Sequence, residues 1–120
     1  MNYKIYPPEE LIETEITLPL SKSISNRALI LDALTPGSPA HPAVAECDDT
    51  DVMIGALADP TADRIDIGAA GTAMRFLTAL MAATPGRTVT IDGTERMRQR
   101  PIGPLVDALR SLGADIDYAG

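Results

Sequence analysis

The feature that most restricts the fold of this sequence is its alternation of short strand-like stretches with longer helix-like stretches. Residues 64–67 and 88–91 alternate polar with apolar side chains, as strands do, and a glycine-containing turn follows each of them. The stretches beyond these turns place apolar residues at helical spacing. We therefore predict an α/β chain, and its 120 residues suffice for one modest hydrophobic core but not for two.

The same patterns predict where the other elements lie. Further strands are expected at residues 2–6, 13–18, 43–47 and 115–118, and helices at residues 23–34, 49–58, 72–83 and 101–112. The third helix is unusually apolar, so we expect it to be buried nearly all round, with Arg75 held by a specific partner. Gly113 is expected to end the fourth helix.

Several residues suggest where these helices begin. The second helix offers Asp49, Thr50 and Asp51 as N-caps, and Asp48 adds a further charge beside its first turn. A metal site at these carboxylates would need converging ligands that the sequence does not supply. Thr72 is the expected cap of the third helix, and Pro101 the expected first residue of the fourth.

Basic residues lie at three predicted helix starts, in the segments 21–27, 68–75 and 97–101. The first backbone N–H groups of a helix have no partner inside it and carry partial positive charge, so a cation there lowers helix stability. A helix start that tolerates this cost commonly binds a phosphate or a carboxylate. Three such starts could face one ligand, although a solvated helix cap with unrelated basic neighbours remains the alternative.

The overall charge narrows the choice of partner. A net charge of -7 and a pI of about 4.5 argue against nucleic acid or an anionic membrane surface. Six of the ten basic residues nevertheless fall in or directly beside the three segments, which favours a small anionic ligand: Lys22, Arg27, Arg75, Arg96, Arg98 and Arg100. A single cysteine, Cys47, and the lack of a signal-peptide pattern make the cytoplasm the default location. No apolar run approaches the roughly 20 residues of a membrane span.

Three segments together resemble the 5-enolpyruvylshikimate-3-phosphate synthase family: residues 21–27 (SKSISNR), 68–75 (GAAGTAMR) and 95–109 (ERMRQRPIGPLVDAL). The resemblance implies transfer of the enolpyruvyl group of phosphoenolpyruvate to the 5-hydroxyl of shikimate 3-phosphate, with release of phosphate, on the route to chorismate and the aromatic amino acids. It implies no cofactor and no metal. It also implies a fold of two similar domains, each built from three βαβαββ units with helices packed inside the sheets, and an active site between the domains.

The resemblance assigns roles to individual residues. Lys22 would be catalytic and would touch both substrates, while Ser23 and Arg27 would hold shikimate 3-phosphate. Gly71 and Arg100 would line the phosphoenolpyruvate site. Thr72, Arg75 and Arg96 would support these contacts.

Three positions depart from the family pattern. Leu20 replaces a glycine, Phe76 replaces a proline, and Ala69 replaces an asparagine. Ala69 would matter most, because it adjoins the phosphoenolpyruvate site, which the herbicide glyphosate also occupies in this family.

The chain is short for such an enzyme, so we expect a fragment that is inactive alone. Residues 1–17 would be a strand region of the other domain, and residues 18–120 the first repeat unit and part of the next. The family is expected to be monomeric, whereas an unpaired sheet edge and uncovered helix surface would favour self-association of the fragment.

Two other functions are compatible with the basic helix starts. One is a non-catalytic module that binds a phosphorylated ligand. The other is an enolpyruvyl transferase acting on a UDP-sugar, but that relative carries a Lys-Asn pair where Lys22 and Ser23 stand here. A dinucleotide or P-loop site is weaker, because no third glycine and no Gly-Lys-Ser/Thr sequence completes either pattern.

Overall fold

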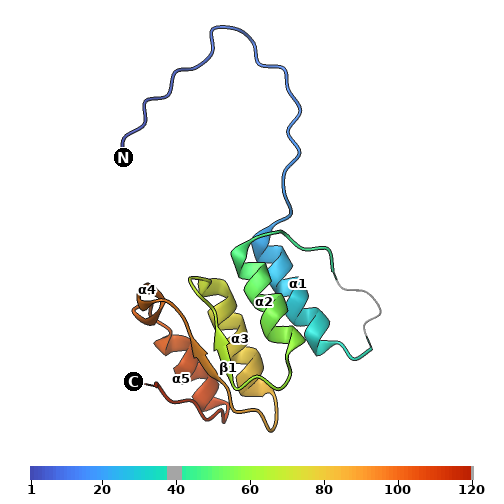
Figure 1. The fold of residues 1–120 in the computed structure, drawn as a ribbon, viewed down its shortest axis with the longest axis vertical. Helices are drawn as coiled ribbons and strands as arrows, with labels where there is room; N and C mark the ends of the chain where they lie inside the picture. The colour runs from blue at the N-terminus through green and yellow to red at the C-terminus, as the bar shows by residue number, and fades with distance from the viewer. Residues whose placement is uncertain (38–41, 120) are drawn as a thin grey trace.

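The computed structural model describes residues 1–37 and 42–119, so the loop expected at residues 35–39 lies partly outside it. Its elements, in chain order, are α1 (Lys22–Leu34), α2 (Asp48–Ala58), β1 (Arg64–Asp66), α3 (Gly71–Ala83), β2 (Thr90–Asp92), α4 (Glu95–Arg98) and α5 (Gly103–Ser111) (Figure 1). Within the described ranges, none of these helices combines the length and the apolar character needed to cross a bilayer.

Residues 1–20 extend away from the rest of the molecule (Figure 1). The radius of gyration, 18.5 Å, exceeds the value of about 14 Å expected for a compact chain of this length. The prediction of strands at residues 2–6 and 13–18 is therefore wrong for this structure, since both stretches are fully exposed and belong to no sheet. A strand needs a hydrogen-bonded neighbour, and this segment lies beside none.

The two strands pair in parallel, with Ile65 opposite Ile91, and α3 connects them. This β1–α3–β2 unit confirms the predicted α/β character. The helix α3 also packs against α1, α2 and α5. The buried core is made by Leu29, Met53, Ile65, Ile67, Ala73, Met74, Leu77 and Met97. Only one face of α3 is fully buried and its other faces are mostly half-buried, so burial nearly all round is not observed.

Helix α1 begins at Lys22, one residue before the predicted start, and the hydroxyl oxygen of its cap, Ser21, accepts a hydrogen bond from the Ile24 backbone N–H at 3.3 Å. The predicted caps of α2 and α3 are wrong. The cap of α2 is Cys47, whose backbone N–H donates to the Thr50 hydroxyl oxygen at 3.3 Å, and the acidic residues lie inside the first turn. The cap of α3 is Ala70, and Thr72 is the second residue of the helix.

The fourth predicted helix begins later than expected. Its first residue is Gly103, not Pro101, because α4 forms first and ends in a turn in which the Arg100 backbone N–H donates to the Met97 carbonyl at 3.0 Å. A proline near the start of α5 is still present, as Pro104. Gly113 follows the helix with a φ of 100°, as predicted.

Two further strand predictions are wrong because side chains occupy the backbone groups that a sheet would need. Between residues 43 and 47, the Ala45 N–H donates to the Ser25 hydroxyl oxygen at 2.8 Å, and the Ala45 carbonyl accepts from the Thr50 hydroxyl at 2.6 Å. Between residues 115 and 118, the Ile116 carbonyl accepts a hydrogen bond from Arg110 Nε at 2.9 Å. Neither stretch therefore joins the sheet.

Candidate functional site

The start of α3 brings together two residues that the sequence assigned to one site. Gly71 is buried, and the guanidinium group of Arg100 lies directly against it. A Cβ atom placed on Gly71 would clash with Arg100 Nη1 and would lie 3.2 Å from its Cζ. Only glycine at this position leaves room for the guanidinium group where it stands.

Arg75 joins the start of α3 to the segment before α5. Its Nη1 donates to the Gly71 carbonyl at 3.1 Å, and its Nη2 donates to the Pro101 carbonyl at 3.2 Å. The expectation that Arg75 has a specific partner is therefore confirmed. These bonds hold residue 101 close to Gly71, and Arg100 is its chain neighbour.

Hydrogen-bond donors at this position remain available for a ligand. Within the described parts of the chain, the Arg100 guanidinium and the Thr72 hydroxyl have no hydrogen bond or ion pair. The backbone N–H groups at the start of a helix add partial positive charge. Arg100 offers a planar fork that matches a carboxylate or a phosphate. The start of α3 can therefore bind a small anion.

A second group of predicted residues lies on α1. Arg27 Nη1 donates to the Ser23 carbonyl at 2.9 Å, and the Arg27 guanidinium lies 5.6 Å from the centre of the Phe76 ring on α3. Phe76 directly follows Arg75, so α3 carries contacts to both groups. Phe76, at a position where the family pattern has proline, thus supports Arg27.

Lys22 contacts a residue that the sequence analysis treated only as helix-start charge. Its Nζ lies 3.4 Å from Asp49 Oδ1, and the Lys22 side chain remains half exposed while that of Asp49 is largely covered. This ion pair ties the start of α1 to the start of α2. Because an ammonium group has three donors, Lys22 can keep this contact and still meet an anion.

Arg96 is not brought to the other predicted residues. It is exposed on α4, and in the ranges that the structure describes its side chain makes no hydrogen bond or ion pair.

A cavity of about 370 Å³ opens between the start of α2 and the turn that precedes α3. Acidic residues of α2 line one side of it, and mostly small residues of the turn before α3 line the other. The lining residues are Asp48, Asp49, Asp51, Val52, Ile67, Gly68, Ala69 and Ala70. Ala69, where the family pattern has asparagine, therefore borders open space. The carboxylates disfavour a phosphate inside this cavity, but they can accept hydrogen bonds from hydroxyl groups.

Sequence reasoning missed a carboxylate at the end of β2. Asp92 accepts two hydrogen bonds from Arg98, from Nε and Nη2, each at 2.9 Å, and one from Arg64 Nη2 at 2.7 Å. The bonds from Arg98, then the bond from the Gly93 N–H, lower the pKa of Asp92 to about 2. In turn Asp92 raises the pKa of Arg98. One sequence signal could have indicated this contact. It is an acidic residue at the end of a predicted strand, six positions before an arginine.

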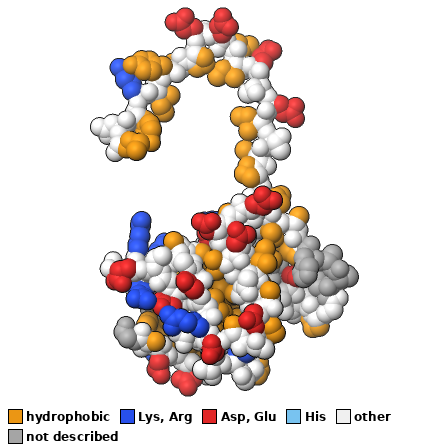
Figure 2. All heavy atoms as spheres, in the orientation of Figure 1, with side chains coloured by type: hydrophobic (Ala, Val, Ile, Leu, Met, Phe, Trp, Pro, Cys, Tyr) orange, Lys and Arg blue, Asp and Glu red, His pale blue; other side chains and the backbone are white. Residues whose placement is uncertain are grey.

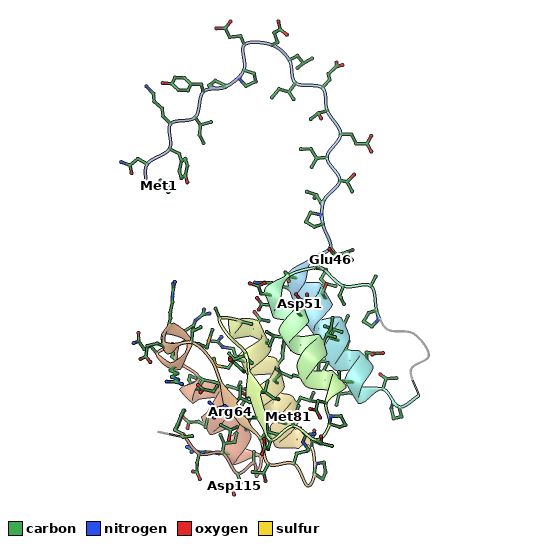
Figure 3. All side chains as sticks on the ribbon, viewed as in Figure 1. Met1, Glu46, Asp51, Arg64, Met81 and Asp115 are labelled. Atoms are coloured by element: carbon green, nitrogen blue, oxygen red, sulfur yellow. The ribbon has the colours of Figure 1, made fainter. Side chains whose placement is uncertain are left out.

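Charged side chains of both signs lie on the surface. Figure 2 shows basic side chains on the side of the globular part where α4 lies, with acidic side chains among them, and further acidic side chains where α1 and α2 begin. Figure 3 shows Glu46 and Asp51 at that acidic end, from which the extended segment leaves. Among the described residues Arg100 has no ionic partner, so the position beside Gly71 can attract an anion despite the overall charge of -7.

Comparison with known proteins gives one consistent result. The sequence model of the family described as EPSP synthase (3-phosphoshikimate 1-carboxyvinyltransferase) matches residues 53–120. A 3-phosphoshikimate 1-carboxyvinyltransferase of Bacteroides fragilis is 57% identical over 118 residues, which cover 98% of this chain and 28% of the relative. Proteins with the same name from Bordetella pertussis and Rhizobium leguminosarum bv. trifolii are 42% and 40% identical, over 98% and 93% of this chain and 31% and 32% of the relatives. The chain thus spans less than a third of the length of these curated relatives.

Proposed function

The chain belongs to the EPSP synthase (3-phosphoshikimate 1-carboxyvinyltransferase) family, and we propose that it forms part of the substrate-binding surface of such an enzyme. That enzyme would join the enolpyruvyl group of phosphoenolpyruvate to the 5-hydroxyl of shikimate 3-phosphate and release phosphate. The observation that carries the proposal is the guanidinium group of Arg100, which rests on Gly71 at the start of a helix and has no partner among the described residues.

Phosphoenolpyruvate would bind at the start of α3. The Arg100 fork would hold its carboxylate or its phosphate, and the backbone N–H groups of the first turn would face the same anion. Gly71 supports this assignment because a side chain there would push the guanidinium group away. Thr72, with its uncommitted hydroxyl, would add one further hydrogen bond.

Shikimate 3-phosphate would bind beside α1. Ser23 has an exposed hydroxyl, and Arg27 is held by the Ser23 carbonyl and the Phe76 ring, which limits its freedom before the ligand arrives. The acidic cavity next to the turn before α3 could accept hydrogen bonds from ring hydroxyls of this ligand. Lys22, half exposed above Asp49, would contact both substrates and stabilise the charge that moves between them.

This arrangement accounts for binding better than for proton transfer. The reaction must remove a proton from the attacking hydroxyl and deliver one to the enolpyruvyl group, and such steps typically need a positioned acid or base. The nearest carboxylate to Lys22, Asp49, is occupied by its ion pair with that residue. We therefore propose that proton transfer depends on the rest of the enzyme and that this chain alone is inactive. We also propose that residues 1–17 belong to the other lobe and residues 18–120 to a βαβαββ repeat unit and part of the next.

Binding to the 120-residue chain tests the proposal directly. Phosphoenolpyruvate is added to ¹⁵N-labelled protein while the amide signals of residues 71–73 and the side-chain Nε signal of Arg100 are followed. We expect shifts at these positions that weaken as salt is added, because the contact is between charges. The Arg100→Ala variant should lose the response, and Gln99→Ala, which changes the neighbouring exposed side chain, should keep it.

Two results would contradict the proposal. One is a response of the same size in Arg100→Ala and wild-type protein. The other is a response confined to residues outside the start of α3.

A further inference from the structure

Asp92 connects three elements through one carboxylate. It ends β2, receives both hydrogen bonds of the Arg98 fork from α4, and receives a third from Arg64 on β1. Its side chain is about one-fifth exposed, whereas those of Arg98 and Arg64 are more than half exposed. The carboxylate is therefore the fixed centre of this network, and the arginines are attached to it.

The backbone places the same region against the turn before α3. The Thr94 N–H donates to the Gly68 carbonyl at 3.0 Å, and the Ile67 N–H donates to the Asp92 carbonyl at 2.8 Å. The segment 98–101 leaves this junction and returns to α3, where Arg75 binds the Pro101 carbonyl. The segment is thus held at one end by Arg98 on Asp92 and at the other by Arg75. Arg100 lies between these two attachments.

We propose that Asp92 is a positioning residue that acts through Arg98 to hold the Arg100 guanidinium group against Gly71. The inference rests on the function proposed above, since it concerns the same anion site. Without Asp92, the segment 98–101 would keep its backbone bonds to α4 and the bond from Arg75 to Pro101, but it would lose the side-chain attachment of Arg98, and the side chain of Arg100 would sample a wider volume. Ligand affinity would fall because the ordering of Arg100 would then have to occur on binding.

Stability alone would not reveal this role. Exposed ion pairs contribute little to the free energy of unfolding, and the arginines of this network are largely exposed. A paired, bidentate geometry nevertheless fixes orientation well. We therefore expect the Asp92→Asn variant to unfold at nearly the same urea concentration as the wild type while the segment 98–101 becomes more mobile.

The test uses ¹⁵N,¹³C-labelled 120-residue protein and its Asp92→Asn variant. In the wild type, a nuclear Overhauser contact is expected between the Arg100 side chain and the Gly71 α-protons, with backbone order at residues 98–101 similar to that of α4. In Asp92→Asn the contact should disappear and the order should fall. Phosphoenolpyruvate affinity, measured by titration, should drop by roughly 3- to 10-fold, the cost of ordering one long side chain on binding.

Three further variants sharpen the result. Asp63→Asn makes the same chemical change at an exposed carboxylate just before β1 and should behave as wild type. Asp92→Glu keeps the charge and should restore part of the Arg100–Gly71 contact. Arg98→Gln removes the same bonds from the exposed side of the pair, so it should reproduce the loss even if Asp92→Asn is poorly folded.

An unchanged Arg100–Gly71 contact and unchanged order at residues 98–101 in Asp92→Asn or Arg98→Gln would overturn the inference. That outcome would leave the proposed function standing, because Arg100 could still bind the ligand. Loss of the contact in both variants, in a protein whose wild type gives no response to phosphoenolpyruvate, would support the positioning role and refute the proposed ligand.

Discussion

At the scale of single residues, Gly71 matters because it lacks a side chain. A methyl group there would meet the flexible end of Arg100, not backbone, so the fold can accommodate it by moving the guanidinium group. We predict that Gly71→Ala leaves the thermal unfolding midpoint nearly unchanged but weakens phosphoenolpyruvate binding about 10-fold, equivalent to one charge-assisted hydrogen bond. Titration and thermal unfolding of the same sample measure both effects. Undiminished affinity would show that Arg100 is not the anion contact.

The buried side chain of Asn26 leads to a prediction about stability, not about binding. Its amide group is fully buried in α1, and neither its oxygen nor its nitrogen has a hydrogen-bond partner among the residues that the structure describes. An unsatisfied buried polar group costs about 1–3 kcal/mol, so Asn26→Leu, of similar size, should raise the free energy of unfolding by about 1 kcal/mol or more.

Urea unfolding measures this change, and the adjacent Ser25→Ala provides the contrast. The Ser25 hydroxyl donates to the Ser21 carbonyl and accepts from the Ala45 N–H, so its removal should destabilise the protein. If Asn26→Leu also proved destabilising, the amide would have a partner, such as an internal water, and its burial would be no cost.

The carboxylate of Asp92 predicts a specific dependence on pH. Its pKa in the folded protein is about 2, below the ordinary value of 3.8, because the Arg98 bonds favour the charged form. The stabilisation is therefore fully present above about pH 4 and is lost as the pH falls towards 2. Because the ion pairs are largely exposed, the difference in urea midpoint between the wild type and Asp92→Asn should be small; it should be largest above pH 4 and vanish near pH 2. A difference that stays constant from pH 6 to pH 2 would show that the pKa of Asp92 is not lowered.

At the scale of elements, helices could be predicted from the sequence better than strands. The apolar spacing of α1, α2, α3 and α5 reflects burial against neighbours that the chain itself supplies. The strands expected at residues 2–6, 13–18, 43–47 and 115–118 depended on neighbours that the periodicity cannot specify. Among the residues that the structure describes, only β1 and β2, which α3 brings side by side, pair with another strand.

The candidate site shows the same division. The resemblance of the sequence to the family assigned Gly71 and Arg100 to one site, and the structure places them in contact. It could not show that Asp49 meets Lys22, since those residues come from different helices. Nor did it show that Arg98 binds Asp92, because the three arginines of residues 96–100 look equivalent in the sequence, whereas the structure places two of them on α4 and Arg100 in the turn after it.

The junction between β2 and α4 depends on one glycine. A Cβ atom on Gly93 would lie 2.6 Å from the Gly68 carbonyl oxygen and 3.2 Å from Met97 Cβ. Neither neighbour can move freely, because the first is backbone and the second is in the core.

We predict that Gly93→Ala lowers the free energy of unfolding by about 1–3 kcal/mol, the usual cost of overpacking. Urea unfolding measures this, with Gly55→Ala, where the added methyl meets open space, as the control. Equal stability of the two variants would show that the close approach at Gly93 is relaxed at little cost.

At the scale of the whole molecule, much apolar surface has no cover. Tyr3, Ile5, Leu11 and Ile16 are exposed along the extended segment, and α1 exposes three more apolar side chains. The chain spans 28% of the length of the Bacteroides fragilis relative. Exposed apolar surface favours association, so we still predict that the chain self-associates.

The central claim, that this chain carries the Arg100 part of an EPSP synthase substrate site, is tested most directly by turnover in a completed enzyme. A chimaera would join residues 1–120 to the remaining part of the Bacteroides fragilis relative, which is 57% identical over the shared region. Phosphate release would be followed with phosphoenolpyruvate and shikimate 3-phosphate together and separately.

We predict that the chimaera releases phosphate only with both substrates and that the 120-residue chain alone does not. Arg100→Ala in the chimaera should lower kcat/KM by roughly 10²- to 10³-fold, as for loss of one positioned donor. Arg100→Lys keeps the charge but not the planar fork, so its kcat/KM should lie between that of Arg100→Ala and that of the unmodified chimaera. Gln99→Ala should match the unmodified chimaera. A chimaera that turns over equally well with Arg100→Ala would contradict the claim.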